Sequence, residues 1–545
     1  MLAPAAMGVL RSDLDPLSPA FARARDAQAE ALARVRELEA KVRALSERSR
    51  AKFEARGQLL PRDRLARLLD PGTGFLELST LAGLGMHDDD GKDEPMGGSS
   101  VVGIGTVSGR LCLVSVTDSG IKGGSIPPMG LKKALRAQEI ALENHLPVIT
   151  LAESAGANLL YQDEIFIEGG RTFAQQARLS AAGVPQITVV HGSSTAGGAY
   201  LPGLSDYVVV VRGKSKIFLA GPPLLKAATG EIADDETLGG AEMHAEQVGT
   251  AEYLAEDDGH AVELARQIAG HLPRIEVPEP PREPRPPRYD AAELLGVVPD
   301  DPKQPYPATE IVARLVDDSE FLAFKPGFGR FTVCGQAHLE GYPIGIIGND
   351  GPIDPAGALK ATQFIQLMTQ ARTPLLFLMN TTGYLVGTDA EGGGMVKHGS
   401  KMIQAVANAP VPKITLVVGG SWGAGNYGMC GRGLSPRFIF SWPSARVGVM
   451  GPEQAATVME IVTQEKMAKR GVPMDPEFLQ SMKDELIAQM TPKTTALYGT
   501  ARLWDDGIID PRDSRRVVAT CLSVCRAAER ARAAAQPITF GVARG

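Results

Sequence analysis

Short apolar runs followed by glycine-rich turns and then by helical stretches recur in both halves of the chain. Residues 147–152 (PVITLA) and 186–190 (QITVV) have the length and apolar character of buried strands, and residues 375–379 and 413–418 are their counterparts. Alternation of such strands with helices indicates βα units built on largely buried sheets. The pattern therefore predicts an α/β fold, and it leaves the strand order open.

The two halves are related by an internal repeat. The segment VPQIT at 184–188 returns as VPKIT at 411–415, an offset of 227 residues from 184 to 411. The same offset takes Gly156 to Gly383. An offset shared by separate segments is improbable by chance, so we infer a duplicated domain.

Changes of composition mark two borders within the 545 residues, a length that itself exceeds one ordinary domain. Residues 19–56 are rich in Ala, Arg and Glu with helical spacing, so we expect residues 1–56 to form a solvated helical arm; the alternative is an arm packed on a partner subunit. Seven prolines lie between residues 271 and 289, and such a segment forms a stiff spacer rather than a helix or a central strand. We therefore predict a linker at 271–290 between domains at 57–270 and 291–545.

Charge and composition exclude several classes of protein. Lys and Arg number 56 against 63 Asp and Glu, a net charge of -7, which disfavours a general nucleic-acid binder. Five scattered cysteines do not make a disulfide framework, and no apolar run approaches the roughly 20 residues that span a bilayer. The spacing of His, Cys and acidic residues gives no metal cluster, and the N-terminus lacks the pattern of a secretory or transit signal. We expect a cytoplasmic protein with no metal on this chain.

Two glycine-rich turns occupy the same place in the two halves. HGSSTAGGAY follows the second strand of the first half and GGSWGAGNY follows its counterpart, so that Gly197 and Gly198 fall on Ala424 and Gly425. Small residues at a strand-to-helix turn leave backbone N–H groups uncovered, at a helix N-terminus where the dipole favours negative charge. Such a turn suits an oxyanion hole. The alternative is that the small residues only permit tight packing of helix on sheet.

The second turn also matches the G-x-S-x-G pattern of a hydrolase nucleophile elbow, with Ser421 as the nucleophile. A triad in the usual hydrolase order requires a histidine after the serine. None of the eight histidines lies beyond His398, so that triad is impossible and we disfavour hydrolysis.

Several motifs resemble those of the β subunits of acyl-CoA carboxylases, from about residue 50 to the C-terminus. They lie at residues 57–64 (GQLLPRDR), 122–125 (KGGS), 195–200 (TAGGAY), 219–224 (LAGPPL), 423–429 (GAGNYGM) and 450–456 (MGPEQAA). The resemblance implies a carboxyltransferase built from two duplicated crotonase-like (ClpP/crotonase) α/β domains, with acyl-CoA on the N-half and biotin on the C-half. It also implies a β hexamer whose sites lie between the N-half of one subunit and the C-half of another.

The same resemblance implies how the glycine turns are used. A separate biotinylated α subunit would carry carboxybiotin, because this chain lacks the Ala-Met-Lys-Met attachment sequence and a nucleotide site. Oxyanions would develop on the thioester and on the biotin ureido oxygen, and each needs preorganised donors. Gly197 and Gly198 are assigned to the acyl-CoA thioester, and Ala424 and Gly425 to biotin; the reverse pairing is the alternative.

Coenzyme A phosphates need cations, and four basic residues follow one another near the expected entrance: Lys122, Lys132, Lys133 and Arg136. The competing interpretation of each is a solvated helix face. The resemblance also places Gly156 near the CoA.

The choice of acyl group rests on a few positions. Asn426 and Tyr427 stand where the propionyl-CoA branch has a Tyr-Asp pair, so the chain is more similar to methylcrotonyl-CoA and geranyl-CoA carboxylases. Methylcrotonyl-CoA enzymes tend to carry aromatic side chains at the positions of Gly169 and Ala174. Their absence should enlarge an acyl pocket that also includes Tyr427.

The resemblance therefore favours geranyl-CoA as substrate, with methylcrotonyl-CoA as the first alternative. A structural alternative is loop drift remote from the acyl chain. Propionyl- or acetyl-CoA carboxylation, a sodium-pump-type decarboxylase subunit and an inactive scaffold paralogue are less favoured.

Overall fold

The computed structural model describes residues 8–89, 91–92, 96–274, 276–301, 304–470, 475–534 and 542. The chain divides into two compact units. The N-unit comprises Arg36–Pro278, Ala501–Leu503 and the chain from Ser523; the C-unit comprises the chain up to Val35, Glu279–Thr500 and Trp504–Leu522. The border at Pro278 falls inside the proline-rich segment, whose residues 276–290 form no helix or strand.

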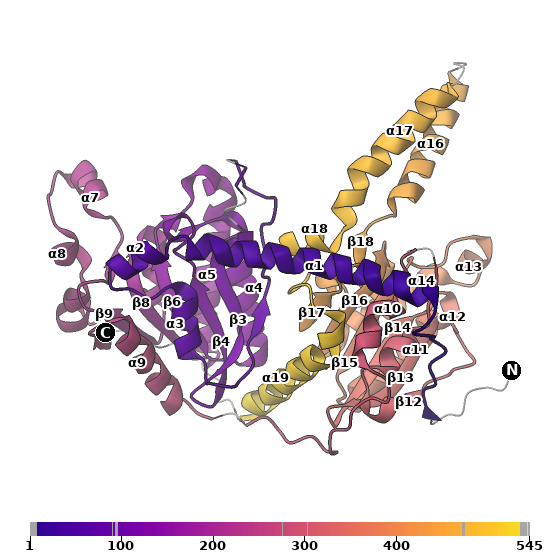
Figure 1. The fold of residues 1–545 in the computed structure, drawn as a ribbon, viewed down its shortest axis with the longest axis horizontal. Helices are drawn as coiled ribbons and strands as arrows, with labels where there is room; N and C mark the ends of the chain where they lie inside the picture. Colours follow the sequence, from indigo (N-terminus) through magenta and orange to yellow (C-terminus); the bar gives the residue numbers. More distant parts are fainter. Residues whose placement is uncertain are drawn as a thin grey trace. The chain divides into compact units, whose positions relative to one another are not determined.

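The N-unit is built on one mixed eight-stranded sheet (Figure 1). Its path runs β11-β9-β8-β6-β4-β3-β2, and β10 pairs with the end of β8. Neighbours from β4 to β11 are parallel, whereas β2, β3 and β4 are antiparallel. The strands are β2 (Leu76–Leu78), β3 (Ser100–Val107), β4 (Arg110–Thr117), β6 (Val148–Ser154), β8 (Gln186–Thr195), β9 (Tyr207–Val211), β10 (Lys216–Phe218) and β11 (Tyr253–Ala255). A separate two-stranded pair joins β5 (Ser125–Ile126) to β7 (Gly156–Ala157).

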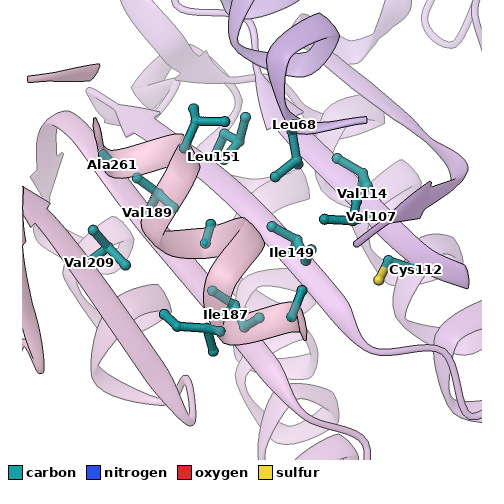
Figure 2. Packing of buried hydrophobic residues seen from close by; sticks show 14 of the residues in the cluster. Leu68, Val107, Cys112, Val114, Ile149, Leu151, Ile187, Val189, Val209 and Ala261 are labelled. Atoms are coloured by element: carbon teal, nitrogen blue, oxygen red, sulfur yellow. The ribbon is translucent and has the colours of Figure 1, made fainter. Parts of the chain in front are cut away.

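Helices cover this sheet because alternate strand residues are apolar on each face. The helices of the N-unit are α2 (Arg50–Ala55), α3 (Pro61–Leu68), α4 (Pro128–Asn144), α5 (Gln162–Ala181), α6 (Tyr200–Gly203), α7 (Pro222–Thr229), α8 (Asp235–Gly239) and α9 (Asp258–His271). Figure 2 shows α9 lying over Ile187 and Val189 of β8, and Leu68 of α3 belongs to the same fully buried cluster. This core fixes the strands whose ends carry the candidate site.

The C-unit repeats the arrangement. Its sheet runs β1-β12-β13-β14-β15-β16-β17, with β18 paired to the end of β16. The strands are β1 (Gly8–Val9), β12 (Glu320–Ala323), β13 (Thr332–Leu339), β14 (Tyr342–Asn349), β15 (Leu375–Thr381), β16 (Lys413–Trp422), β17 (Phe438–Ser441) and β18 (Arg446–Gly448). The helices are α10 (Leu294–Val297), α11 (Ala308–Ala313), α12 (Pro355–Gln370), α13 (Thr388–Gly392), α14 (Met395–Asn408), α15 (Gly425–Gly428), α16 (Pro452–Lys469) and α17 (Pro476–Met490). α16 and α17 run side by side as a hairpin, joined by an ion pair of 2.7 Å between Lys483 and Glu460 (Figure 1).

The predicted duplication is confirmed down to the register of the strands. β6 pairs with β8 through Ser154 and Ser194, and β15 pairs with β16 through Thr381 and Ser421, each pair related by the offset of 227. Both pairings shift register just before these residues. The four strands predicted from apolar runs are also confirmed, and each strand following the repeated Val-Pro extends further, into the glycine-rich turn.

The N-terminal segment differs from the predicted solvated arm. α1 (Pro19–Glu47) buries one face, which includes Phe21, Leu32, Val35, Leu38 and Val42. Residues 1–56 form no unit of their own, because the part up to Val35 belongs to the C-unit and the remainder to the N-unit. α19 (Ser514–Ala534) is likewise divided after Leu522, so the predicted C-terminal domain at 291–545 does not hold the end of the chain.

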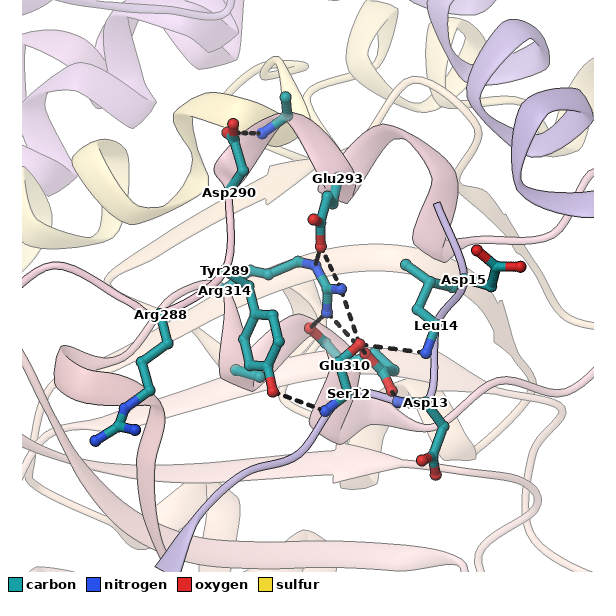
Figure 3. Close-up of polar contacts among 12 residues, drawn as sticks. Ser12, Asp13, Leu14, Asp15, Arg288, Tyr289, Asp290, Glu293, Glu310 and Arg314 are labelled. Carbon is teal, nitrogen blue, oxygen red and sulfur yellow. Dashed lines mark hydrogen bonds and ion pairs between the residues drawn. The ribbon is translucent and has the colours of Figure 1, made fainter. Parts of the chain in front are cut away.

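A buried arginine fastens the segment before α1 to the C-unit (Figure 3). Arg314, fully buried, donates to Glu293 at 2.6 Å, to Glu310 at 2.7 Å and to Ser12 Oγ at 3.0 Å. The Asp13 N–H donates to Glu310 at 2.9 Å. These bonds hold the segment before α1 on the C-unit.

Among the described residues, no helix combines the length and the apolar character needed to cross a membrane.

Candidate active site

The N-unit turn begins where β8 ends. Ala196 adopts a left-handed backbone with φ 54°, and the short 3-10 turn Ala196–Ala199 leads directly into α6. Gly197 and Gly198 place no side chain over their backbone N–H groups. Gly197 is exposed and Gly198 is buried. The turn therefore offers two adjacent donors at a helix start, which is the arrangement that stabilises an oxyanion.

The C-unit turn has the same geometry with different residues. Gly423, at φ 55°, takes the place of Ala196, and Ala424 and Gly425 take the places of the two glycines. Within the described chain no group accepts a hydrogen bond from the Ala424 N–H, whereas the Asn426 N–H donates to the Gly423 carbonyl at 3.1 Å. A methyl group on Gly425 would lie 2.8 Å from the Gly383 Cα, so this position requires glycine.

A side-chain hydroxyl beneath each turn holds the neighbouring loop. Ser154 Oγ accepts from the Gly156 N–H at 3.1 Å, and Thr381 Oγ1 accepts from the Gly383 N–H at 3.1 Å. Gly156 has φ 88°, and a Cβ there would lie 3.5 Å from the Thr195 carbonyl, so the loop passes directly beside the turn. The sequence prediction found Gly156 but missed Ser154 and Thr381, although the offset of 227 relates them too.

Ser421 is not placed to act as a nucleophile. Its side chain is fully buried, donates to Met379 Sδ at 2.7 Å and accepts from Asn426 Nδ2 at 2.7 Å. Ser194, its counterpart in the N-unit, is equally buried and donates to the Gly198 carbonyl at 2.8 Å. Both serines therefore support the turns from below.

The four basic residues expected to bind coenzyme A phosphates differ in their exposure to solvent. Lys122 and Lys132 are exposed, and Arg136 is partly buried, 3.4 Å from Glu139. Lys133 is wrong as a phosphate ligand, because its buried ammonium donates to the carbonyls of Gly97 at 3.0 Å and Ser100 at 2.7 Å. Burial lowers the pKa of Lys133 to about 8.

Gly169 and Ala174, both predicted to line the acyl pocket, lie on different faces of α5. Gly169 is four residues before Phe173 on α5 and shares its face; a Cβ on Gly197 would lie 3.7 Å from the Phe173 ring. Ala174 is turned roughly 140° from Gly169 around the helix axis. It lines a different, surface groove of about 410 Å³ together with residues such as Leu135. Phe173 was missed by the sequence prediction, and nothing in the local sequence distinguishes it from a core aromatic residue.

One tyrosine lies in the short helix that follows each turn. Tyr427 and its counterpart Tyr200 are each 48% exposed. Tyr200 packs on Phe173 with ring centroids 5.5 Å apart. Tyr427 thus belongs to the C-unit turn, whereas Gly169 and Phe173 flank the N-unit turn.

Within the described residues, no group of three or more His, Cys, Asp or Glu side chains is placed to hold a metal ion.

Comparison with known proteins identifies the family. The carboxyl transferase domain model matches residues 52–537. The biotin-dependent 3-methylcrotonyl-coenzyme A carboxylase beta1 subunit of Mycobacterium tuberculosis is 48% identical over 503 residues, which is 92% of this chain and 93% of that protein. The mitochondrial methylcrotonoyl-CoA carboxylase beta chain of Dictyostelium discoideum is 47% identical over 475 residues, 86% of this chain and 80% of that protein.

A solved structure extends the likeness to the whole fold. The beta subunit of geranyl-CoA carboxylase from P. aeruginosa has a TM-score of 0.92 and 59% identity, covering 99% of this chain and 100% of that chain. The chain belongs to the carboxyl transferase family, among the β subunits of biotin-dependent acyl-CoA carboxylases. The α/β class and the duplication implied by the sequence resemblance are thereby confirmed.

Proposed function

We propose that this chain transfers a carboxyl group from carboxybiotin to the γ carbon of a 3-methyl-2-enoyl-CoA thioester. One observation carries the proposal: two equivalent turns, one in each unit, each follow a residue in the left-handed conformation and present two adjacent backbone N–H groups of small residues. Carboxyl transfer between two carriers develops negative charge on two oxygens, and two such turns match that need.

The residues of this chain act through their backbone. The N–H groups of Gly197 and Gly198 hold the thioester oxygen while the charge of the deprotonated acyl group delocalises onto it. Those of Ala424 and Gly425 hold the ureido oxygen of biotin. Carboxybiotin, when bound, supplies both the carboxyl group and the base. The fit is good because a small residue at each position leaves the donors uncovered, and no side-chain acid or base is needed on this chain.

We further propose geranyl-CoA as the preferred substrate. Gly169 lies on the face of α5 that borders the N-unit turn, and a Cβ there would meet nothing within 4 Å. An aromatic side chain buries about 150–250 Å², so its absence leaves room for several methylenes. The relative of P. aeruginosa named above is a geranyl-CoA carboxylase, which agrees. Methylcrotonyl-CoA is the second candidate, because two relatives carry that name.

The proposal includes an assembly. The β chains would form a homohexamer and receive biotin from a biotinylated α subunit. Lys122, in the turn before α4, and Lys132 and Arg136, on α4, would bind the CoA phosphates, with Gly156 beside the CoA. A cytoplasmic location stays a prediction.

The test is a carboxylation assay with the α partner, ATP and bicarbonate, across acyl-CoA chain lengths. Geranyl-CoA should react with the higher kcat/KM, since each buried methylene contributes roughly 0.8 kcal/mol. Gly169→Phe should depress turnover of geranyl-CoA by tenfold or more and spare methylcrotonyl-CoA. Ala174→Phe, on the other face of α5, is the matched control and should leave the preference unchanged. If the enzyme carboxylates neither thioester, the proposed function is refuted. Equal effects of Gly169→Phe on both substrates would refute the placement of Gly169 in the acyl pocket.

A further inference from the structure

The motif at residues 57–64 has no place in the site described so far, although it is part of the resemblance to the family. In the structure it contacts both strands that lead into the N-unit site. Gln58 Nε2 donates to the backbone carbonyl of His191 on β8 at 2.7 Å. Arg64 donates to the Glu153 carboxylate on β6 at 2.9 Å. The motif thus clamps the two strands three to six residues before the turns begin.

Arg64 sits at the centre of a buried network. Its side chain is fully buried and also donates to Asp258 at 3.0 Å, and Asp258 in turn faces His191 Nδ1 at 2.9 Å. Burial raises the pKa of Asp258, but the hydrogen bond from His191 and the charge of Arg64 outweigh it, so the pKa is lowered. Burial, together with the charge of Arg64, lowers the pKa of His191. At neutral pH a neutral His191 therefore donates to an ionised Asp258.

Glu153 connects this network to the site. It directly precedes Ser154, whose hydroxyl holds the Gly156 N–H, and a Cβ on Gly198 would lie 3.4 Å from that hydroxyl. The Glu153 side chain packs so closely on Gly192 of β8 that a Cβ at Gly192 would lie 2.9 Å from its Cδ. Any shift of Glu153 therefore moves the backbone on both sides of the N-unit turn.

The C-unit does without these charges. The residues at the same offset from Glu153 and His191 are Asn380 and Val418. Asn380 Oδ1 accepts from the Gly420 N–H at 3.1 Å, so a neutral amide contacts the neighbouring strand β16 there. At this position, one residue before the supporting hydroxyl, a carboxylate therefore occurs in the N-unit and not in the C-unit, and the N-unit is the side assigned to acyl-CoA.

We infer that Arg64 is a positioning residue for carboxyl transfer: by holding and neutralising Glu153, it fixes the Ser154–Gly156 loop against the Gly197–Gly198 turn. The inference rests on the proposed function, which assigns that turn to the thioester oxyanion. An unpaired Glu153 carboxylate would be an uncompensated anion one residue from Ser154, and it would oppose the negative charge that develops on the thioester.

The experiment compares two reactions of the assembled enzyme with its α partner. The first is carboxylation of geranyl-CoA, which needs both turns. The second is loss of CO₂ from carboxybiotin without acyl-CoA, which needs only the C-unit turn. Arg64→Met should lower kcat of the first at least 30-fold with KM within threefold, and leave the second unchanged. Arg64→Lys, which keeps the charge but loses the paired contacts, should lower kcat about tenfold.

Arg64→Met leaves both Glu153 and Asp258 without the arginine, but Asp258 keeps its bond to His191. Adding Glu153→Gln removes the unpaired charge beside Ser154 and should restore at least tenfold of the lost kcat. Arg266→Met, which removes a partly buried arginine paired with Asp70 at 2.9 Å away from the turn, is the matched control and should retain kcat. If Arg64→Met does not assemble, the Arg64→Lys result decides. Retained kcat in the folded variants, or a parallel loss of both reactions, overturns the inference. An unmodified enzyme that carboxylates neither thioester instead refutes the proposed function, and the inference falls with it.

Discussion

Replacing Ala424 with proline would delete one N–H from the C-unit turn and change little else. Ala424 has φ -68° and ψ -12°, and the proline ring holds φ near -65°. The residue before it is Gly423, which lacks the Cβ that a following proline crowds. Within the described chain the Ala424 N–H has no acceptor, so no internal hydrogen bond is lost.

The expected magnitude is the general cost of losing one oxyanion donor. Removing one oxyanion donor costs about 2.7–4 kcal/mol of transition-state stabilisation, or roughly 10²–10³ in kcat. The stability of the fold should not fall, because proline at a compatible φ stabilises by about 0.4–1 kcal/mol through the unfolded chain. A large loss of turnover without a loss of stability is therefore expected, a combination that general misfolding would not produce.

The assay measures kcat for geranyl-CoA carboxylation, loss of CO₂ from carboxybiotin without acyl-CoA, and the thermal midpoint. Both reactions should slow in Ala424→Pro if this turn serves biotin. Ala424→Gly retains the N–H and is the matched control. Loss of the first reaction alone would reverse the assignment of the two turns. Turnover within fivefold of the unmodified enzyme would refute the view that these N–H groups stabilise an oxyanion.

Four further outcomes are expected. Ser421→Ala should keep most turnover, and fluorophosphonate probes should leave the protein unlabelled; covalent labelling at Ser421 would restore the hydrolase interpretation. Lys133→Met should remove a pH dependence of the free energy of unfolding. The pKa of Lys133 is about 8 in the folded protein and higher in the unfolded chain, so the unmodified protein gains stability as the pH rises above 8. Urea titrations should show this gain, relative to the variant, as up to roughly 1.4 kcal/mol per pH unit. Gly423→Ala should cost about 1–2 kcal/mol of unfolding free energy at its φ of 55°, whereas Ala196→Gly, at φ 54°, should cost nothing or stabilise slightly, as calorimetry would show. Light scattering should find a homohexamer, and a stable monomer competent for transfer would contradict that assembly.

The parts of the fold that the sequence predicts are those with a local signal. Buried strands are short apolar runs between turn residues, and the repeat at 227 residues needs no structural knowledge to detect. The two glycine turns were found in the same way, because uncovered backbone requires small residues. The hydrogen-bond donors of these turns are backbone N–H groups, and small residues leave such groups uncovered. The sequence therefore already indicates the donor positions, which are Gly197, Gly198, Ala424 and Gly425.

The direction of a side chain has no such signal. Lys132 and Lys133 are neighbours of the same type, yet helix geometry sends one to solvent and the other into the N-unit core. Gly169 and Ala174 both lack bulk, but five helical residues place them on different faces of α5. The buried face of α1 was missed for a related reason, since its apolar residues are diluted by Ala and Arg and its partners lie far away in sequence.

The duplicated halves show which features the chemistry demands and which belong to one ligand. The left-handed residue before each turn is Ala196 in one unit and Gly423 in the other, yet their φ values differ by one degree. The donor pair is Gly-Gly in one and Ala-Gly in the other, and the supporting hydroxyl is serine in one and threonine in the other. Backbone geometry is thus retained while residue identity varies, as expected if the N–H groups are the active parts. The charge beneath the turn is not retained, because the position of Glu153 in the N-unit is occupied by Asn380 in the C-unit. Different ligands above two equal turns would account for that difference, and so the asymmetric positions, rather than the shared glycines, are where specificity for acyl-CoA or biotin should be sought.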